Sequence, residues 1–430
     1  MRNLVSLSIV FAATVLAQPS AVAPPGEMTL QQAVEEAVAH NLDLAAARLG
    51  ISVAEARRVT AALRPNPVLS LSAEHLDLLG TGFNAVNNAG PAEYAIRTDF
   101  VYERGQKRER RMALAEAEVG LAELQLRDVA RQTMFNVQNA FIAAQQAKEN
   151  LELARSNLKS LQAIVTVNRE RVRTGDLARV ELERSEVAAL QYEAAVRQSE
   201  LQLQQARNNL QLLLGRVAPT PAFDISGTLR RETIKSSFDD LQAQALRMRP
   251  DLLSARQTQA RSQADLRLQI AQGKVDWTWG VEARRQQGLA GTGNMLGLYI
   301  SAPLPVWNKN QGEILRAQRE ITQNGARATA LDASIRTEIL NAWQQYTSNQ
   351  NLLAEIEKGM LPRAREVRQT TEYSYRRGEA SLVEFLDAQR AFNDTMQTYN
   401  DARASLARSL YLIESVTAAS VSGSPQGGSN

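Results

Sequence analysis

Apolar residues recur at every seventh position along one very long stretch of the chain that contains no proline. The stretch runs from Gly105 to Arg173 and has Gly120 as its only interior glycine. The repeating residues are Ala130, Val137, Ala144, Leu151, Leu158, Val165 and Val172. At 1.5 Å per residue, a helix of about 70 residues would be roughly 105 Å long. A heptad repeat sustained over this length predicts coiled-coil packing.

Two further stretches carry the same seven-residue repeat. They comprise Leu182, Ala189, Val196, Leu203 and Leu210, and then Ile339, Tyr346, Leu353, Met360 and Val367. The helices expected at about Thr29–Leu63 and Leu177–Leu214 together match the length of the single long helix. Each half of the chain would then supply two rods of about 100 Å, one continuous and one made of two pieces. Such rods suit the wall of a tube better than a compact globule.

Four short segments alternate between apolar and polar residues, which is the period of a β-strand. They are Pro67–Leu76, Tyr94–Tyr102, Val275–Arg285 and Met295–Pro305. Each has about 9–11 residues, the length of a tilted strand that crosses a bilayer. Gly- and Asn-rich loops are expected between them, at 77–93 and 286–294. The alternative is an ordinary four-stranded sheet packed on helices.

Aromatic residues gather in or beside these segments. Tyr94, Tyr102, Trp277, Trp279 and Trp307 lie where the aromatic girdles of a membrane interface would lie. If the strands cross a membrane, the alternation predicts that Trp277, Trp279 and Val281 face lipid. Asp276, Thr278 and Glu282 would then face the lumen.

The chain is built from two copies of one pattern. Thr29–Arg48 resembles Ser237–Arg256, and both open with a hydroxyl residue followed three positions later by a capping partner. We therefore predict a tandem duplication, with repeats at 28–215 and 237–417. An irregular connector, 216–236, joins them, and the Gly/Ser-rich tail 418–430 is expected to be disordered.

The first 23 residues have the three parts of a secretory signal peptide. Arg2 precedes a largely apolar run, and Ala21-Val22-Ala23 forms a cleavage site of small residues. No later segment approaches 18 consecutive apolar residues. If this protein crosses a bilayer, it must therefore do so with strands.

Composition narrows the choice of function. A net charge of +3 on 430 residues gives no case for nucleic-acid binding. The absence of cysteine excludes disulfides and thiolate metal sites, and the only histidines are His40, expected on a helix, and His75, expected on a strand. We expect no cofactor, no dedicated metal site and no enzymatic activity, because no catalytic constellation is present.

Four strands cannot close a membrane barrel, because an open edge leaves backbone groups unpaired in lipid. Known barrels begin at about eight strands, so three chains with four strands each would close one with an open lumen. We thus predict a mainly α-helical chain with a small β part. Its coiled-coil helices would form an α-helical barrel, and its strands a membrane β-barrel shared between three chains.

Two sequence elements resemble the TolC family of outer-membrane efflux channels. The motif "YRRGEASLVEFLDAQ" (Tyr375–Gln389) is similar to the Tyr-x-x-Gly element of that family. "PLPVWNKNQGEI" (Pro303–Ile314) resembles the strand-to-helix entry of the branch that serves heavy-metal cation efflux, the CzcC/CusC-like proteins. The duplicated pattern extends the resemblance over nearly the whole chain after the signal peptide.

The resemblance implies a homotrimeric, passive exit duct in the bacterial outer membrane, with its helical tube in the periplasm. Its partners would be outer-membrane lipid, a periplasmic adaptor protein and an inner-membrane pump of the RND type. Helix-hairpin turns at Gly175 and Gly378 would form the tip of the tube. Glu384 and Asp387 fall where family members carry the carboxylates that ring the periplasmic aperture. The arginine that helps to lock the family's closed state is replaced by Ala380.

Several alternatives stay open. Glu384 also completes a capping box with Ser381 and so has a purely structural role available. The Glu–Arg neighbours in "QKRERR" and "ERSE" are interpreted as solvated helix faces. Within the same fold, the channel could instead serve drug efflux or type I secretion. From another class, the rival is a secreted coiled-coil scaffold.

Overall fold

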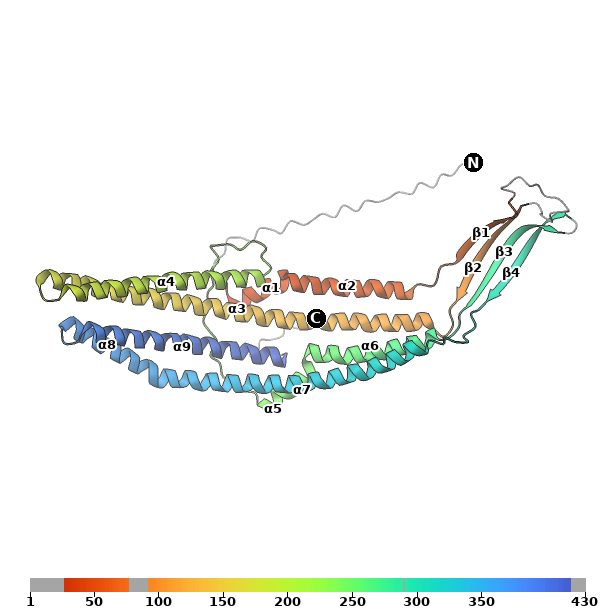
Figure 1. Ribbon diagram of the computed structural model, residues 1–430. Coiled ribbons are helices and arrows are strands. Elements are labelled where there is room, and N and C mark those ends of the chain that lie inside the picture. The colour runs from red at the N-terminus through yellow and green to blue at the C-terminus, as the bar shows by residue number, and fades with distance from the viewer. Residues whose placement is uncertain (1–26, 77–91, 289–290, 419–430) are drawn as a thin grey trace, which may run out of the picture.

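The computed structural model describes residues 27–76, 92–288 and 291–418, which form a long helical body with a sheet at one end (Figure 1). The first repeat comprises α1 (Leu30–His40), α2 (Leu42–Ala62), β1 (Val68–Glu74), β2 (Glu93–Tyr102), α3 (Lys107–Thr174) and α4 (Arg179–Leu213). The second comprises α5 (Phe238–Met248), α6 (Pro250–Gln272), β3 (Trp277–Gly288), β4 (Gly291–Ser301), α7 (Gln311–Glu355), the π-helical turn η1 (Ile356–Met360), α8 (Leu361–Arg377) and α9 (Leu382–Thr417). The same order of elements thus occurs twice, except that α7, η1 and α8 stand where the first repeat has the single helix α3. The mainly helical class with a small antiparallel sheet is confirmed.

Several predicted segments lie outside the described residues. They are the signal peptide at 1–23, the predicted tail 418–430 except for Ala418, which caps α9, and most of the first strand-to-strand loop, at 77–91. The second predicted loop, 286–294, is wrong in extent. β3 continues to Gly288 and β4 begins at Gly291, so the hairpin has longer strands and a shorter connection than its Gly-rich sequence indicates.

The predicted rods are present in the first repeat. α3 is a single helix of 68 residues, and α1, α2 and α4 lie alongside it in Figure 1. Along α3 the heptad residues Val137, Ala144, Leu151 and Val165 are buried. Leu203 and Leu210 of α4 are buried as well, as the coiled-coil pattern predicts.

In the second repeat the heptad prediction fails beyond Leu353. Ile339, Tyr346 and Leu353 are buried, but Met360 and Val367 are exposed. The cause is the π-helical turn η1, whose wider turn shifts the phase of every following residue. Ile356 and Leu361 are buried in their place.

The helix predicted at about Thr29–Leu63 is broken in two, and so is its counterpart in the second repeat. Asn41 has an extended backbone, and its Oδ1 accepts hydrogen bonds from the N–H groups of Asp43 and Leu44. Arg249 is extended because the residue before a proline avoids the helical region, and Pro250 then starts α6. At both breaks, the residue that ends one helix is also the N-cap of the next.

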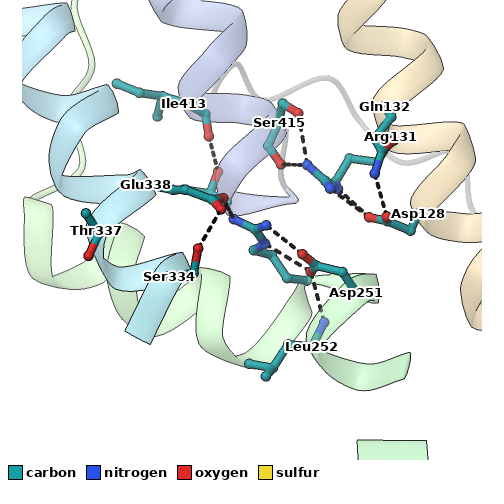
Figure 2. Close-up of polar contacts among 12 residues, drawn as sticks. Asp128, Arg131, Gln132, Asp251, Leu252, Ser334, Thr337, Glu338, Ile413 and Ser415 are labelled. Carbon is teal, nitrogen blue, oxygen red and sulfur yellow. Dashed lines mark hydrogen bonds and ion pairs between the residues drawn. The ribbon is translucent and has the colours of Figure 1, made fainter. Parts of the chain in front are cut away.

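The break at Arg249 carries a charge cluster in which the arginine is buried and Glu338 is partly exposed (Figure 2). The Arg249 side chain is only 4% exposed and donates hydrogen bonds of 2.6 Å to both Asp251 and Glu338. Beside it, Arg131 of α3 binds Asp128 at 2.7 Å and donates to the Ser415 carbonyl near the end of α9 at 3.1 Å. The cluster therefore links α6 to α7 and lies beside a contact between α3 and α9.

The connector 216–236 has no regular secondary structure except a short bridge but is anchored in the core. Ile225 pairs with Met28 in a parallel bridge, and Phe223 is fully buried against α1, α3 and α4. Further along, the N–H of Ile234 donates to the hydroxyl of Tyr346 at 3.0 Å. These contacts fasten the connector to both repeats.

The four strands form one antiparallel sheet in the order β1-β2-β3-β4. Each repeat supplies one hairpin, and the repeats join where β2 pairs with β3, with Phe100 opposite Trp279. β1 and β4 are the outer strands, so each leaves one edge without a partner strand in the described chain. None of the helices among the described residues combines the length and apolar character needed to cross a membrane.

Candidate functional site

The two hairpin turns lie together at the end of the helical body remote from the sheet (Figure 1). Gly175 ends α3 with φ 84°, and Gly378 ends α8 with φ 82°, a left-handed conformation that glycine adopts without strain. A Cβ atom on Gly378 would lie 3.1 Å from the Arg171 guanidinium. The two turns therefore approach each other closely.

An apolar cluster lies directly behind the turns. Tyr375 stacks on Phe385 with ring centroids 5.5 Å apart, and Leu161, Ile164 and Leu382 complete the cluster with Ala188. Burial raises the pKa of Tyr375, although a hydrogen bond to Asn168 opposes the shift. Ala380 packs against this cluster.

Neutral polar side chains cross the seam between the two hairpins. The Tyr375 hydroxyl donates to Oδ1 of Asn168 at 2.7 Å, and Nε2 of Gln389 donates to Oδ1 of Asn157 at 3.1 Å. Nδ2 of Asn168 and Oε1 of Gln389 have no hydrogen-bond partner among the described residues. Buried polar atoms are almost always paired, so this seam is incompletely satisfied. Separating the helices would let water bind these amides, which lowers the cost of opening the seam.

Glu384 completes the predicted capping box at the start of α9. Its Oε2 accepts hydrogen bonds from the backbone N–H and the hydroxyl of Ser381, at 2.7 and 2.9 Å. The hydrogen bond from the Ser381 backbone is the main reason that the pKa of Glu384 lies below its usual value. The side chain is nevertheless exposed, so the cap leaves the charge in contact with solvent.

Asp387 is exposed one turn further along α9. Its nearest charged neighbour is Arg390, at 3.7 Å, and both side chains are about two-thirds exposed or more. Sequence reasoning missed Arg390, although the i,i+3 spacing of opposite charges on a helix could have indicated the pair. The exposed face of α9 near the turn therefore carries Glu384, Asp387 and a compensating cation.

At the other end of the molecule, one face of the sheet is apolar and open to the surroundings. Tyr94, Tyr102, Trp277 and Trp279 all project from this face, and Phe100 stacks on Trp279 at 5.1 Å. Leu298 and Ile300 of β4 are 77% and 82% exposed on the same side. An apolar patch of this extent usually marks a surface that another apolar phase or a partner covers.

The opposite face of the sheet is polar and internally paired. Arg97 binds Asp99 at 2.8 Å and lies over the Tyr299 ring, whose hydroxyl donates to Glu282 at 3.0 Å. Arg284 donates to Glu282 at 2.9 Å. The lack of a side chain at Gly280 makes room for this network, since a Cβ there would lie 2.2 Å from the Asp99 carboxylate.

The predicted alternation along β3 is present. Trp277, Trp279 and Val281 share the apolar face, whereas Thr278 and Glu282 lie on the polar face. Asp276 precedes the strand and binds Lys107 at 2.6 Å, so it belongs to the helix-to-strand junction. The interpretation of "QKRERR" as a solvated face is wrong in part, because Lys107 is buried and Arg108 donates to the Ala62 carbonyl at 2.6 Å.

Neither histidine belongs to a metal centre in the described part of the chain. His40 ends α1, and His75 lies just beyond β1 rather than within it, 3.9 Å from Glu93. No group of three His, Asp or Glu side chains that could bind a metal ion occurs among residues 27–76, 92–288 and 291–418.

The sequence is similar to a metal-resistance protein and to a pyoverdine export protein. The cobalt-zinc-cadmium resistance protein CzcC of Cupriavidus metallidurans is 24% identical over 365 residues, which cover 85% of this chain and 84% of that protein. The pyoverdine export outer membrane protein OpmQ of Pseudomonas putida is 26% identical over 393 residues, 84% of this chain and 80% of that protein.

The fold is also that of a solved channel. A crystal structure of CusC, described in terms of folding and transmembrane channel formation, superposes with a TM-score of 0.73 at 19% identity. The match covers 90% of this chain and 91% of CusC. The model of the outer membrane efflux protein family matches residues 33–216 and 241–418, one segment in each repeat. The chain therefore belongs to the outer membrane efflux protein family and is an outer-membrane efflux channel.

Proposed function

We propose that three copies of this chain form a passive exit duct through the outer membrane, fed by an inner-membrane pump of the RND type through a periplasmic adaptor. The observation that carries the proposal is the two-faced sheet. Its exposed apolar face, with Trp277 and Trp279, suits contact with lipid, and its paired polar face suits contact with water in a lumen.

The open edges of the sheet support the trimer. In lipid, each unpaired backbone N–H or C=O group costs several kcal/mol, so β1 and β4 need partner strands. Four strands are too few to close a barrel. A barrel of about eight strands is just wide enough for side chains to fill its interior. Three chains would give a closed sheet with room for a water-filled lumen.

The helices would continue this lumen into the periplasm. α3 has 68 residues, which corresponds to roughly 100 Å at 1.5 Å per residue. Packed side by side, the helices of three chains would surround the lumen and form the wall of a tube. The duct itself would use no energy source, and the pump would supply the driving force.

We propose that Glu384 and Asp387 ring the aperture at the tip. Both are exposed on α9 near the turn at Gly378. Three copies of each around one axis would place six carboxylates at the mouth, which would favour cations over anions. Arg390 would offset part of this charge, so Asp387 should contribute less than an isolated carboxylate.

The proposed substrates are heavy-metal cations. CzcC, the cobalt-zinc-cadmium resistance protein, supports this choice. A second candidate is an organic export substrate, which the comparable similarity to the pyoverdine exporter OpmQ favours. A deletion strain tested against zinc, cobalt, cadmium, copper and silver, beside a panel of drugs and siderophores, separates the two. Sensitivity to organic compounds alone would exclude the metal substrate.

The membrane position is tested with single cysteines, because the chain has none of its own. Cysteines at Trp279 and Leu298 should resist a membrane-impermeant thiol reagent, and cysteines at Thr278 and Ser70 should react through the lumen. Equal labelling of both sets would contradict the proposal. A stable monomer in mild detergent with a native circular dichroism spectrum would contradict the shared sheet.

A further inference from the structure

A basic hollow lies where the helices meet the sheet. α3 begins there, α6 ends there, and the chain passes from β4 into α7 close by (Figure 1). The hollow has a volume of about 410 Å³ and is lined by Gly105, Gln106, Arg110, Arg267, Ile270, Ala271 and Lys274. Three of these residues are cationic, and none is acidic.

The three cations lack an anionic partner. Among the residues that the structure describes, none of Arg110, Arg267 and Lys274 has a carboxylate within 4.0 Å, and Arg110 donates only to the Gln106 amide oxygen, at 3.2 Å. The nearby acids are already engaged. Asp276 binds Lys107, and Glu103 binds Arg111. The hollow therefore holds a surplus of positive charge that a ligand could neutralise.

The local backbone helps to form this hollow. Gly105 has φ 77°, and a Cβ atom there would lie 2.6 Å from Cδ of Lys274. Glycine at this position therefore allows the Lys274 stem, which lines the hollow, to pass close over the turn. Gly273 serves the neighbouring loop in the same way, because a Cβ there would lie 2.6 Å from the Lys309 carbonyl oxygen.

Apolar surface adjoins the hollow. Ile270 in its lining is about half exposed. Arg104, next to Gly105, lies with its guanidinium 4.8 Å from the centre of the Trp277 ring on the apolar face of the sheet. The loop after β4 exposes Leu304, Val306 and Trp307. Cationic and exposed apolar side chains thus lie close together at the junction between the helices and the sheet.

A second hollow of about 470 Å³ shares this level. It also contacts Gly105 and Gln106 and is lined by the cations Arg64, Arg104, Lys107 and Arg108, with Glu103 and Glu109. Its acids make it less selective for anions than the hollow formed by Arg110, Arg267 and Lys274. The turn between β2 and α3 therefore separates a mixed hollow from a purely cationic one.

We propose that the cationic hollow binds the phosphate of an anionic phospholipid, whose acyl chains lie against the apolar face of the sheet. The inference rests on the proposed function, because it requires the sheet to lie in a membrane. Arginine and lysine are the side chains that bind phosphate most strongly. Basic residues beside a membrane surface favour anionic lipids. A free phosphate ion would satisfy the charge but would leave Ile270 and Trp277 uncovered.

The test uses the full-length protein in detergent with fluorescent phosphatidylglycerol as the probe. Unlabelled phosphatidylglycerol should displace it at lower concentration than phosphatidylcholine, and inorganic phosphate should displace it poorly. The double variant Arg267→Gln with Lys274→Gln should weaken phosphatidylglycerol binding about tenfold or more. The matched control, Lys159→Gln with Arg363→Gln, removes two exposed helix cations far from the junction and should bind like the wild type.

Three results would overturn the inference. They are equal displacement by the two lipids, unchanged binding in the junction variant, and displacement by inorganic phosphate as effective as by phosphatidylglycerol. Single-channel currents in phosphatidylcholine bilayers check the proposed function separately. If the protein conducts but shows no lipid preference in the displacement assay, only the phospholipid site is rejected. If no current is seen in any lipid, the channel in which the site is placed is rejected.

Discussion

The hydroxyl of Tyr375 donates a 2.7 Å hydrogen bond to Oδ1 of Asn168, which joins the ends of two helical hairpins that are 207 residues apart in the chain. The bond is buried and neutral. Its acceptor residue has a second polar atom, Nδ2, with no partner in the described structure. The two hairpins are thus joined by this bond, by the hydrogen bond from Gln389 to Asn157, and by a polar seam that is incompletely paired.

The first prediction removes that hydrogen bond. Tyr375→Phe keeps the ring that stacks on Phe385 but leaves both Oδ1 and Nδ2 of Asn168 without a hydrogen-bond partner in the described structure. This should cost about 1–2 kcal/mol of local stability. We expect the tip to open more often, so the open probability of single channels in planar bilayers should rise. Tyr373→Phe, at an exposed ring on the same helix, is the control. Equal open probability in both variants would show that the bond does not restrain the tip.

The second prediction concerns the proposed gate. Asp387→Ala combined with Glu384→Gln should weaken divalent-cation block and cation preference in planar bilayers, because it removes both carboxylates. Folding should be nearly unaffected, since exposed charges contribute little and Gln can still complete a capping box. Ser381→Ala is the complementary variant, which should cost about 1 kcal/mol through loss of the cap while leaving block unchanged. Unchanged selectivity in the double variant would remove these carboxylates from the gate.

The third prediction tests the charge cluster around the buried Arg249. Arg249→Met would leave the half-buried Asp251 and the more exposed Glu338 without their shared cation, and we expect a loss of about 1–3 kcal/mol in the free energy of unfolding. Arg247→Met, at an exposed position in the last turn of α5, should have little effect. Chemical denaturation in detergent measures both, and similar midpoints for the two variants would contradict the role of the cluster.

The fourth prediction follows from the pKa of Asp251 in the same cluster. Burial would raise this pKa, but hydrogen bonds and charge from Arg249 outweigh burial and hold it below its usual value. A carboxyl with a lowered folded-state pKa stabilises the protein fully above its unfolded pKa of about 3.9. Its contribution is lost as the pH falls through the lower folded value. Asp251→Asn should therefore be less stable than the wild type at neutral pH, and the difference should shrink below about pH 4.

The fifth prediction separates the two faces of the sheet. Leu298→Arg places a charge on the apolar face, where it should oppose membrane insertion by about 2–4 kcal/mol near the bilayer midplane. Ser72→Arg places the same charge on the polar face and should insert normally. Heat-modifiable trimers in membrane fractions provide the measurement. Equal insertion of the two variants would argue against lipid contact at Leu298.

Periodicity predicted the long elements well because their packing is repetitive. The seven-residue spacing of Val137, Ala144 and Leu151 reflects one continuous contact surface, and the alternation from Trp277 to Glu282 reflects the two faces of one sheet. Both signals are local in the sequence. The spacing and the alternation can therefore be recognised without knowing which segments pack together.

The remaining features depend on single residues or on distant partners. The breaks at Asn41 and Arg249 lie where one residue leaves the helical conformation, which changes the apolar spacing little. The π-helical turn at Ile356–Met360 contains Gly359 and comes just before Pro362, which has no N–H to donate within the helix. Neither residue by itself specifies the shift in phase that the turn causes. The bond between Tyr375 and Asn168 could not be predicted, because nothing in either segment identifies the other.

The two outer strands, β1 and β4, have a genetic consequence. A chain damaged only at its β4 edge would still pair normally through β1 with an intact neighbour. It would enter the ring and then prevent the ring from closing, so only rings composed wholly of intact chains would conduct. Mutations at either edge should therefore be dominant over a wild-type copy in the same cell, whereas mutations that prevent the chain from folding should be recessive.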